Sequence, residues 1–328
     1  MAPTRNLWPR DMSAEKAPAL LALDWGTTSL RAFLVAADGT VAERRSTQQG
    51  ILQVKDGDFD AALEEIAGAW LARHPELPAL ASGMIGSRQG WREAPYAEAP
   101  AGLAELAKGL VSVAGRQGRR LAIVPGVVYR AAAAPPDVMR GEETQMLGAL
   151  AAARPDEPTV FVLPGTHSKW AIAQAGRIVW FATFMTGELY AVLKAESILG
   201  RLMAGEAEDA RSFQRGLARA ADASPAAGAL LHKLFSARSL ALFDELPATG
   251  IASYLSGLLI GSELDEALAA VSARLGARPL CVTLIGEAAL SRLYLAALGE
   301  REIEGRLAEP DATARGLLAI AQAAGLLG

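Results

Sequence analysis

The amino-acid sequence predicts an α/β protein made of two duplicated domains with a cleft between them. A strand that runs into a Gly-Thr-x-Ser loop and then into a hairpin occurs twice, first at Gly26 and again at Gly165. Matched glycines keep a nearly constant spacing, since Gly165 follows Gly26 by 139 residues and Gly187 follows Gly50 by 137. A period close to half of the 328-residue chain is too long for a solenoid and implies two homologous domains.

The first half opens with an apolar strand and a hairpin. The turn Asp38-Gly39 separates two alternating runs, which is a strong hairpin signal. Further on, Trp70 and several Ala, Leu and Ile residues recur at helical spacing, which predicts an amphipathic helix. The predicted elements of this half are strands at 19–23, 30–36, 40–46 and 79–82, a helix at 59–71 and a glycine-rich loop at 83–87.

The second half repeats this order and then becomes mainly helical. A hairpin with its turn at Gly176 follows the second Gly-Thr-x-Ser loop. The run Arg-Pro-Asp-Glu-Pro at residues 154–158 breaks the helical pattern between the halves, so we expect one domain at 18–152 and another at 153–328. The predicted elements are strands at 159–163, 170–174, 177–184 and 280–285, and helices at 188–203, 251–275, 288–298 and 313–326, with Ala-rich helices up to about residue 246.

Composition and charge exclude several classes of protein. Residues 1–17 lack the apolar core of a signal peptide, so we expect a flexible lead-in, and no apolar run suits a membrane span. The single cysteine, Cys281, excludes a disulfide framework and a cysteine-based zinc site. A net charge of −4 without a basic stripe argues against a nucleic-acid partner. We therefore expect a cytoplasmic protein with a small-molecule substrate, and its apolar helices leave surface for a homodimer.

Both Gly-Thr-x-Ser loops have the chemistry of a phosphate-binding nest. Small residues bring backbone N–H groups and hydroxyls to one spot, where they donate to a phosphate without steric bulk. Asp24 ends the first strand, and a carboxylate beside phosphate oxygens implies an intervening Mg²⁺ held through water. Lys169 follows the second loop and offers a positive charge to a β- or γ-phosphate. The predicted phosphate-binding residues are Gly26, Thr27, Thr28, Ser29, Gly165, Thr166, His167, Ser168 and Lys169.

The significance of these loops depends on their occurring as a pair. One such loop alone is most often an ordinary turn, because turns use Gly, Thr and Ser freely. Two copies at matched positions, one with Asp24 and the other with Lys169, instead favour a cleft that clamps a nucleotide's phosphates from both sides. Positioning and charge neutralisation of this kind are what phosphoryl transfer requires.

The loops also resemble known motifs. Residues 23–31 (LDWGTTSLR) resemble the phosphate-1 motif of the hexokinase/actin/heat-shock-70 superfamily, and residues 164–170 (PGTHSKW) resemble its phosphate-2 motif. Residues 285–289 (IGEAA) stand where the superfamily has its adenosine loop, without its Gly-Gly pair. The resemblance implies two ribonuclease-H-like (actin-like ATPase) domains with ATP in the cleft between them, and Gly286 and Glu287 at the adenosine.

Over nearly its whole length the chain resembles the 2-dehydro-3-deoxygalactonokinase family. The strings that carry this resemblance are SGMIGSRQGWREAPY (82–96), VPG (124–126), DVMRGEETQML (137–147), LPGTHSKW (163–170) and GLLIGSE (257–263). The resemblance implies an enzyme that uses ATP and Mg²⁺ to phosphorylate the terminal C6 hydroxyl of 2-dehydro-3-deoxy-D-galactonate.

A sugar kinase needs a carboxylate that receives the proton of the acceptor hydroxyl. In the superfamily this carboxylate commonly lies at the start of the helix that closes the first domain, which here begins at residues 140–145. The candidates are Asp137, Glu142 and Glu143, although acidic residues at this place also complement the helix dipole. We favour Glu142 as the catalytic base, with Asp137 second.

The implied acceptor carries a carboxylate, for which backbone N–H groups and an arginine are suitable partners. The loop at 83–90 contains Arg88, whose alternative interpretation is a solvated surface residue, and Trp91 follows it as a wall for the site. The predicted substrate-binding residues are Gly83, Met84, Ile85, Gly86, Ser87, Arg88 and Trp91.

Two other functions stay open at the level of sequence. Another sugar or sugar-acid kinase of the superfamily would use the same loops with a different acceptor. A non-catalytic ATP-binding switch, as in actin or chaperone folds, would use the same cleft without an acceptor pocket. Turnover of a 2-dehydro-3-deoxy sugar acid separates the enzyme from the switch.

Overall fold

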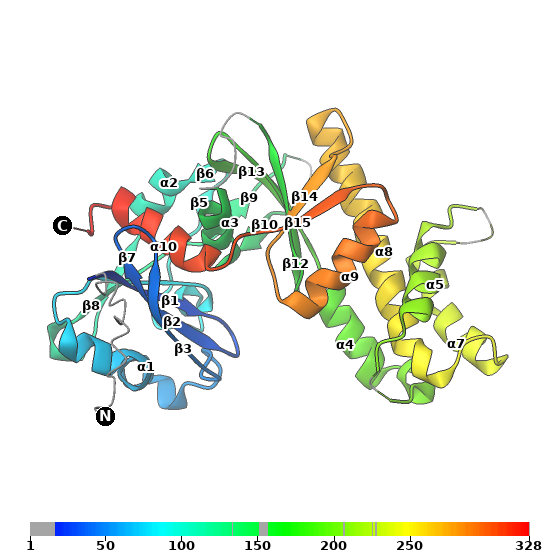
Figure 1. The fold of residues 1–328 in the computed structure, drawn as a ribbon, viewed down its shortest axis with the longest axis horizontal. Helices are drawn as coiled ribbons and strands as arrows, with labels where there is room; N and C mark the ends of the chain where they lie inside the picture. Colours follow the sequence, from blue (N-terminus) through cyan, green and yellow to red (C-terminus); the bar gives the residue numbers. More distant parts are fainter. Residues whose placement is uncertain are drawn as a thin grey trace, which may run out of the picture.

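The computed structural model describes residues 17–132, 134–150, 157–205, 207–224, 226 and 228–327. Two six-stranded sheets belong to the two halves of the molecule, and a group of helices projects from the second half (Figure 1). The expected lead-in, apart from Ala17, and the expected boundary between residues 152 and 153 lie outside the described residues.

The first sheet is built on the predicted hairpin. Its central strand β1 pairs antiparallel with β2 and parallel with β4, and β2 pairs antiparallel with β3. β1 is a nearly continuous apolar run and is buried on both faces, whereas the edge strand β3 is polar and largely exposed. In sheet order the strands are β3 (Val41–Thr47), β2 (Leu30–Ala36), β1 (Pro18–Trp25), β4 (Ala79–Ser82), β8 (Arg120–Ile123) and β7 (Val111–Ala114).

The second sheet repeats this arrangement. Its strand β11 pairs antiparallel with β12 and parallel with β14, and β12 pairs antiparallel with β13. The pair β14–β15 is parallel, as is the pair β4–β8 in the first sheet. In sheet order the strands are β15 (Glu304–Leu307), β14 (Cys281–Leu284), β11 (Thr159–Leu163), β12 (Ser168–Gln174), β13 (Arg177–Phe184) and β6 (Ala101–Gly102). The shared order confirms the predicted α/β fold with two duplicated domains.

Two glycines of the repeat hold equivalent places in the two halves. A Cβ atom on Gly50 would lie 2.3 Å from the backbone of Thr27, and one on Gly187 would lie 2.3 Å from the carbonyl oxygen of Gly165. Each glycine therefore packs directly against the Gly-Thr-x-Ser loop of its own half, where any side chain would displace the loop. This contact gives the 137-residue offset between the two glycines a structural cause.

A segment of short strands connects the halves. Strands β5 (Ala97–Glu98), β9 (Val127–Tyr129) and β10 (Asp137–Met139) form a three-stranded sheet, and β6 extends the second sheet by pairing with β13. Residues of the first half thereby contact the second sheet. The sequence does not predict these strands, because two or three residues are too few to show an alternating pattern.

Helices cover both faces of the first sheet. On one face α1 packs over a core in which Trp25, Ile66 and Trp70 are buried. On the other face lie α3 and the C-terminal helix α10, which returns from the second half (Figure 1). The helices of this part are α1 (Phe59–Arg73), α2 (Leu103–Lys108), α3 (Glu142–Leu150) and α10 (Ala312–Ala323).

The helices α3 and α10 cross with their backbones in close contact at Gly148 and Gly316. A Cβ atom on Gly148 would lie 1.9 Å from the carbonyl oxygen of Ala312, and one on Gly316 would lie 1.9 Å from that of Thr144. One hydrophobic core contains residues of both helices together with Phe161 of the second sheet. The crossing therefore joins the two halves through a continuous core.

The second half carries the helical group α4 to α9. The long helix α8 packs against α5 through Gly216 and Gly257, each of whose Cβ atoms would lie 2.1 Å from a carbonyl oxygen of the other helix. The predicted helix at 188–203 is too long, because α4 ends where the Ser197 hydroxyl donates to the carbonyl of Leu193. None of the helices in the described ranges is long and apolar enough to cross a membrane. The helices are α4 (Thr186–Glu196), α5 (Ala210–Ala221), α6 (Leu230–Leu234), α7 (Ser236–Leu242), α8 (Ile251–Leu275) and α9 (Ala288–Gly299).

Candidate active site

A cavity of about 1030 Å³ lies between the two halves, and both Gly-Thr-x-Ser loops contribute to its wall. The N-terminus of α3, the glycine-rich loop after β4 and the loop after β14 also line it. The structure thus brings distant segments together at the predicted cleft. The predicted site residues in its wall are Asp24, Gly26, Gly83, Met84, Glu142, Gly165, His167, Gly286 and Glu287.

Three glycines of this wall are not required by the fold. A Cβ atom on Gly165 would meet no atom within 4 Å, and those on Gly26 and Gly286 would make only ordinary contacts of 3.4 Å or more. Their missing side chains instead leave room for a ligand to approach the backbone closely. Gly83 is different, because its φ of +94° and a Cβ position 2.8 Å from the Trp25 carbonyl oxygen make glycine necessary for the loop itself.

Asp24 lies at the end of β1 and contacts the guanidinium of Arg31 on the paired strand β2. It is only 8% exposed, yet it forms part of the cavity wall. The described residues contain no group of three or more His, Cys, Asp or Glu side chains that could hold a metal ion. A divalent cation beside Asp24 would therefore need phosphate oxygens and water as its other ligands, which suits Mg²⁺.

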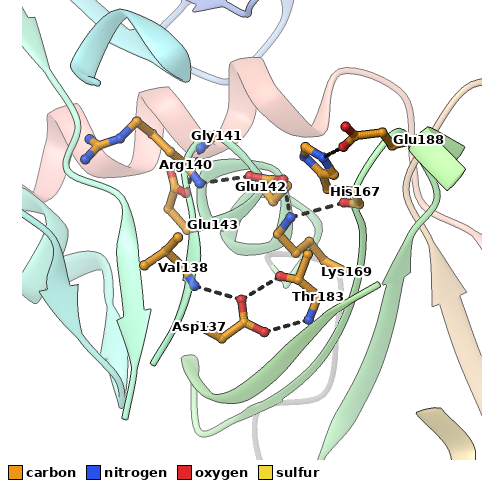
Figure 2. Close-up of polar contacts among 10 residues, drawn as sticks. All are labelled: Asp137, Val138, Arg140, Gly141, Glu142, Glu143, His167, Lys169, Thr183 and Glu188. Carbon is orange, nitrogen blue, oxygen red and sulfur yellow. Dashed lines mark hydrogen bonds and ion pairs between the residues drawn. The ribbon is translucent and has the colours of Figure 1, made fainter. Parts of the chain in front are cut away.

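Glu142 and Lys169 meet across the two halves (Figure 2). The Nζ atom of Lys169 on β12 lies 3.3 Å from Oε1 of Glu142 at the start of α3, and it also donates to the His167 carbonyl at 3.1 Å. The Arg140 backbone N–H donates to Oε2 of Glu142 at 3.0 Å. The Lys169 side chain is 6% exposed and that of Glu142 is 27% exposed. The Glu142 carboxylate is thus held in place and remains accessible.

Glu143, the next residue, is fully buried. Its Oε2 accepts a hydrogen bond from the Gly141 N–H at 2.7 Å, and its Oε1 lies 3.1 Å from the Thr144 hydroxyl. Burial, followed by the charge of Glu142, raises the pKa of Glu143 to about 7. Glu143 therefore supports the loop at Gly141 and does not line the cavity.

Asp137 lies on β10, apart from Glu142 (Figure 2). Its Oδ1 accepts from the Thr183 hydroxyl at 2.6 Å and from the Val138 N–H at 2.8 Å, and its Oδ2 accepts from the Thr183 N–H at 2.6 Å. Asp137 does not line the cavity. Its carboxylate ties the three-stranded sheet to β13 of the second sheet.

The second Gly-Thr-x-Ser loop is anchored to the core behind it. Ser168 is buried and donates its hydroxyl to Oε1 of Glu263 on α8 at 2.7 Å, so this hydroxyl is engaged away from a phosphate. Glu263 also accepts from Trp170 Nε1 at 2.8 Å and from the Tyr294 hydroxyl at 2.6 Å, and burial raises its pKa. In front of the loop, Thr166 is exposed and His167 contacts Glu188 (Figure 2).

The first loop presents its hydroxyls differently. Thr27 and Thr28 are exposed at a turn that the Gly26 N–H closes by donating to the Ser29 carbonyl at 2.9 Å. Neither threonine lines the cavity in this structure.

The glycine-rich loop after β4 divides into two parts. Gly83 and Met84 line the cavity, and Ile85 and Gly86 are buried beneath. The predicted substrate-binding residues Ser87, Arg88 and Trp91 do not line it. Arg88 is exposed and pairs with Glu93 at 3.1 Å, and Trp91 stacks on Phe59 with ring centroids 6.1 Å apart.

Four arginines line the cavity that were not among the predicted site residues, namely Arg31, Arg44, Arg45 and Arg140. Arg31 follows the first loop by two residues, and Arg140 directly precedes Gly141 and Glu142. For Arg31 and Arg140, the neighbouring motif residues were the signal in the sequence that could have identified them as site residues. Strand pairing determines the position of Arg31, because β2 places this residue opposite Asp24 on β1.

A second cavity of about 530 Å³ adjoins the first at Gly165, which lines both. Helices α4, α5, α8 and α9 surround it. Its wall combines apolar residues such as Leu259 and Leu290 with polar residues such as Glu208 and Ser253. An elongated ligand bound at the second Gly-Thr-x-Ser loop could therefore extend into this adjoining cavity, which has both apolar and polar walls.

Comparisons with known proteins agree on one family. The family model described as 2-keto-3-deoxy-galactonokinase matches residues 24–320. A Rhizobium meliloti (strain 1021) protein named 2-dehydro-3-deoxygalactonokinase DgoK1, with the qualifier "probable", is 38% identical over 92% of this chain and 96% of its own. The 2-dehydro-3-deoxygalactonokinase of Escherichia coli (strain K12) is 36% identical over 74% of this chain and 78% of its own.

A solved structure agrees as well. It is a crystal structure from Sinorhizobium meliloti, described as a candidate 2-dehydro-3-deoxygalactonokinase, with a TM-score of 0.83 and 35% identity. The match covers 93% of this chain and 98% of that one. The chain belongs to the 2-keto-3-deoxy-galactonokinase family.

Proposed function

We propose that this protein is an ATP-dependent kinase that transfers the γ-phosphoryl group to the C6 hydroxyl of 2-dehydro-3-deoxy-D-galactonate. The products are the 6-phosphate and ADP. The observation that carries this proposal is the contact of Lys169 with Glu142, which lines the cavity between two duplicated glycine loops. Family membership supports the acceptor.

ATP fits the two adjoining cavities. Its phosphates would lie along the open backbone at Gly26 and Gly165, where the missing Cβ atoms leave space. The nucleoside would continue past Gly165 into the second cavity, whose wall includes residues of α9 directly after Gly286 and Glu287. Pockets of this mixed apolar and polar kind suit a nucleobase.

Mg²⁺ fits beside Asp24. When bound there, it would neutralise charge on the β- and γ-phosphate oxygens. Asp24 is the carboxylate that would hold it through water, and Arg31 keeps that carboxylate oriented.

Glu142 is the proposed base. It accepts the proton of the C6 hydroxyl while the C6 oxygen forms its bond to the γ-phosphorus. The bond from the γ-phosphorus to the β,γ-bridging oxygen breaks, and its electron pair leaves on ADP. Asp137 is the weaker candidate, because its two hydrogen bonds with Thr183 hold β10 and β13 together.

Lys169 has a second partner in this scheme. In the structure its ammonium pairs with Glu142, and a bound triphosphate would compete for the same positive charge. Transfer of Lys169 to a phosphate oxygen would leave the Glu142 carboxylate free for the acceptor hydroxyl. Occupation of the ATP site thereby prepares the base.

Turnover with defined acceptors tests the proposal. Purified protein with ATP and Mg²⁺ should phosphorylate 2-dehydro-3-deoxygalactonate far faster than its gluconate epimer, glucose or water. Absence of turnover on every 2-dehydro-3-deoxy sugar acid, with ATP binding retained, would favour the non-catalytic switch. Fast turnover of another sugar would favour a different kinase of the superfamily. The cytoplasmic location and the homodimer stay predictions of the sequence.

A further inference from the structure

We propose that Arg140 recognises the carboxylate of the acceptor. The sugar acid would then lie with its C1 carboxylate at Arg140 and its C6 hydroxyl at Glu142. This inference rests on the proposed function, and it replaces Arg88 as the residue that distinguishes a sugar acid from a neutral sugar.

Some hydrogen-bond donors of the Arg140 guanidinium have no acceptor among the described residues. Its Nη2 donates to the Ala94 carbonyl at 2.9 Å, and the group lies over the Tyr96 ring, 4.3 Å from the ring centroid. The Nε and Nη1 atoms are buried and have no hydrogen-bond partner among the described residues. These two atoms carry three of the five N–H donors of a guanidinium. Buried charged donors without acceptors are costly to keep, and a bound anion would relieve that cost.

The positive charge of Arg140 is also uncompensated. No carboxylate of the described residues pairs with its guanidinium within 4 Å, although the side chain lines the cavity. Two other arginines in the cavity wall pair with carboxylates, Arg31 with Asp24 and Arg44 with Asp311. Arg45 instead donates to the Ile66 carbonyl and lies over the Trp70 ring. Arg140 therefore attracts an anionic group to its side of the cavity, and a guanidinium matches a carboxylate in shape and charge.

The side chains of Arg140 and Glu142 extend in different directions from the same loop (Figure 2). Its backbone N–H donates to Glu142 Oε2, which fixes the two residues relative to each other. Figure 2 shows the guanidinium on the side of the loop away from the Glu142 carboxylate. The loop is held closely, since a Cβ atom on Gly141 would lie 3.2 Å from the Gly83 Cα. A six-carbon acid bound along this wall would present opposite ends to the two residues.

Arg88 provides a matched control. Its side chain is 88% exposed, pairs only with Glu93 among the described residues, and does not line the cavity. Arg88→Gln therefore changes the net charge of the protein by the same amount as Arg140→Gln. It leaves the proposed subsite unchanged.

Kinetics with an acid and its neutral C1 amide test the proposal. Wild-type protein should prefer the 2-dehydro-3-deoxygalactonate acid over the amide, and Arg140→Gln should raise KM for the acid by about 10- to 100-fold because a charge-assisted contact is lost. KM for the amide and for ATP should change less than threefold by comparison. Arg140→Lys should give an intermediate KM for the acid, and Arg88→Gln should behave as wild type.

Each other outcome overturns the subsite. Equal losses on acid and amide would show that Arg140 only shapes the loop, and an acid-specific loss in Arg88→Gln would return the role to Arg88. If Arg140→Gln fails to fold, the acid-to-amide ratio of Arg140→Lys decides, and an unchanged ratio counts against the proposal. If wild type phosphorylates neither compound, the proposed function fails. In that case, calorimetry measures the affinity of wild type and of Arg140→Gln for the acid and so tests the subsite separately. Equal affinities would overturn the proposed role of Arg140.

Discussion

Three carboxylates lie within residues 137–143, and their surroundings give them different properties. Asp137 accepts three hydrogen bonds, and Glu143 is buried with a pKa of about 7. Glu142 is partly exposed and contacts Lys169. A base must reach the substrate hydroxyl, so the surroundings favour Glu142, which is partly exposed and lines the cavity.

Glu142→Gln keeps the size of the side chain and removes the base. We expect kcat to fall by about 10² or more, because general-base catalysis contributes about 10²–10⁴. KM for ATP should change little, and steady-state kinetics with both substrates measures the two effects. A kcat within threefold of wild type would show that Glu142 is not the base.

Glu143 makes stability depend on pH. Its pKa rises from an ordinary 4.5 to about 7 on folding, so the folded state holds a proton that the unfolded state releases. This stabilisation is fully present below pH 4.5 and is lost as pH rises through about 7. Glu143→Gln mimics the protonated form and should flatten the pH dependence of the unfolding free energy over this window. Denaturant titrations at several pH values measure it; parallel curves for both proteins would contradict the prediction.

At the scale of elements, helix α3 and the loops around it depend on supports that lie in other parts of the chain. Asp137 ties β10 to β13, and Glu263 on α8 anchors the second Gly-Thr-x-Ser loop through Ser168. Gly187 packs on the same loop from α4. The site is therefore precise because neighbouring elements leave its loops few alternatives.

Asp137→Asn tests whether the carboxylate is structural. The change weakens its hydrogen bonds to Thr183, so we expect a loss of about 1–3 kcal/mol in unfolding free energy. The kcat should stay within threefold of wild type. Thr183→Val removes one partner, and a double-mutant cycle with Asp137→Asn should show coupling between the two. A large fall in kcat at unchanged stability would instead support Asp137 as the base.

Gly165→Ala and Gly187→Ala separate ligand binding from folding. The new Cβ at Gly165 has free space, so the protein should keep its thermal stability while KM for ATP rises about tenfold or more through loss of close phosphate contact. The Cβ at Gly187 would collide with the Gly165 carbonyl oxygen and should lower the melting temperature. Wild-type ATP affinity in Gly165→Ala would remove that loop from the phosphate site.

At the scale of the whole molecule, the two halves share a hydrophobic core and enclose a cavity between them. The helices α3 and α10 cross at Gly148 and Gly316, and a pair of charged side chains spans the cavity. These contacts connect the halves, and the cavity between them is open to ligands. Phosphoryl transfer also requires that water be excluded while the reactants are bound.

We expect the halves to close over bound ligands. Small-angle scattering should show a smaller radius of gyration with a non-hydrolysable ATP analogue and the sugar acid together than without ligands. The analogue alone serves as the control for effects of nucleotide. An unchanged radius with both ligands would argue against closure.

The sequence by itself determined the duplicated fold and the two Gly-Thr-x-Ser loops. Their strands, glycines and turns are local patterns of period two or fixed spacing, so residues near one another in the chain carry the signal. The family string at residues 137–147 likewise contains Glu142, directly after Gly141. The short strands β5, β6, β9 and β10 and the polar edge strand β15 were not predicted, because pairing with distant strands creates them.

Only the tertiary structure decided which predicted residues reach the same cavity. Arg88, Trp91 and Asp137 lie in the right segments but have partners elsewhere, whereas Arg140 enters the wall with buried donors unpaired. Such roles depend on the direction of a side chain and on partners far away in the chain. Local sequence holds neither, because packing of separate elements sets both.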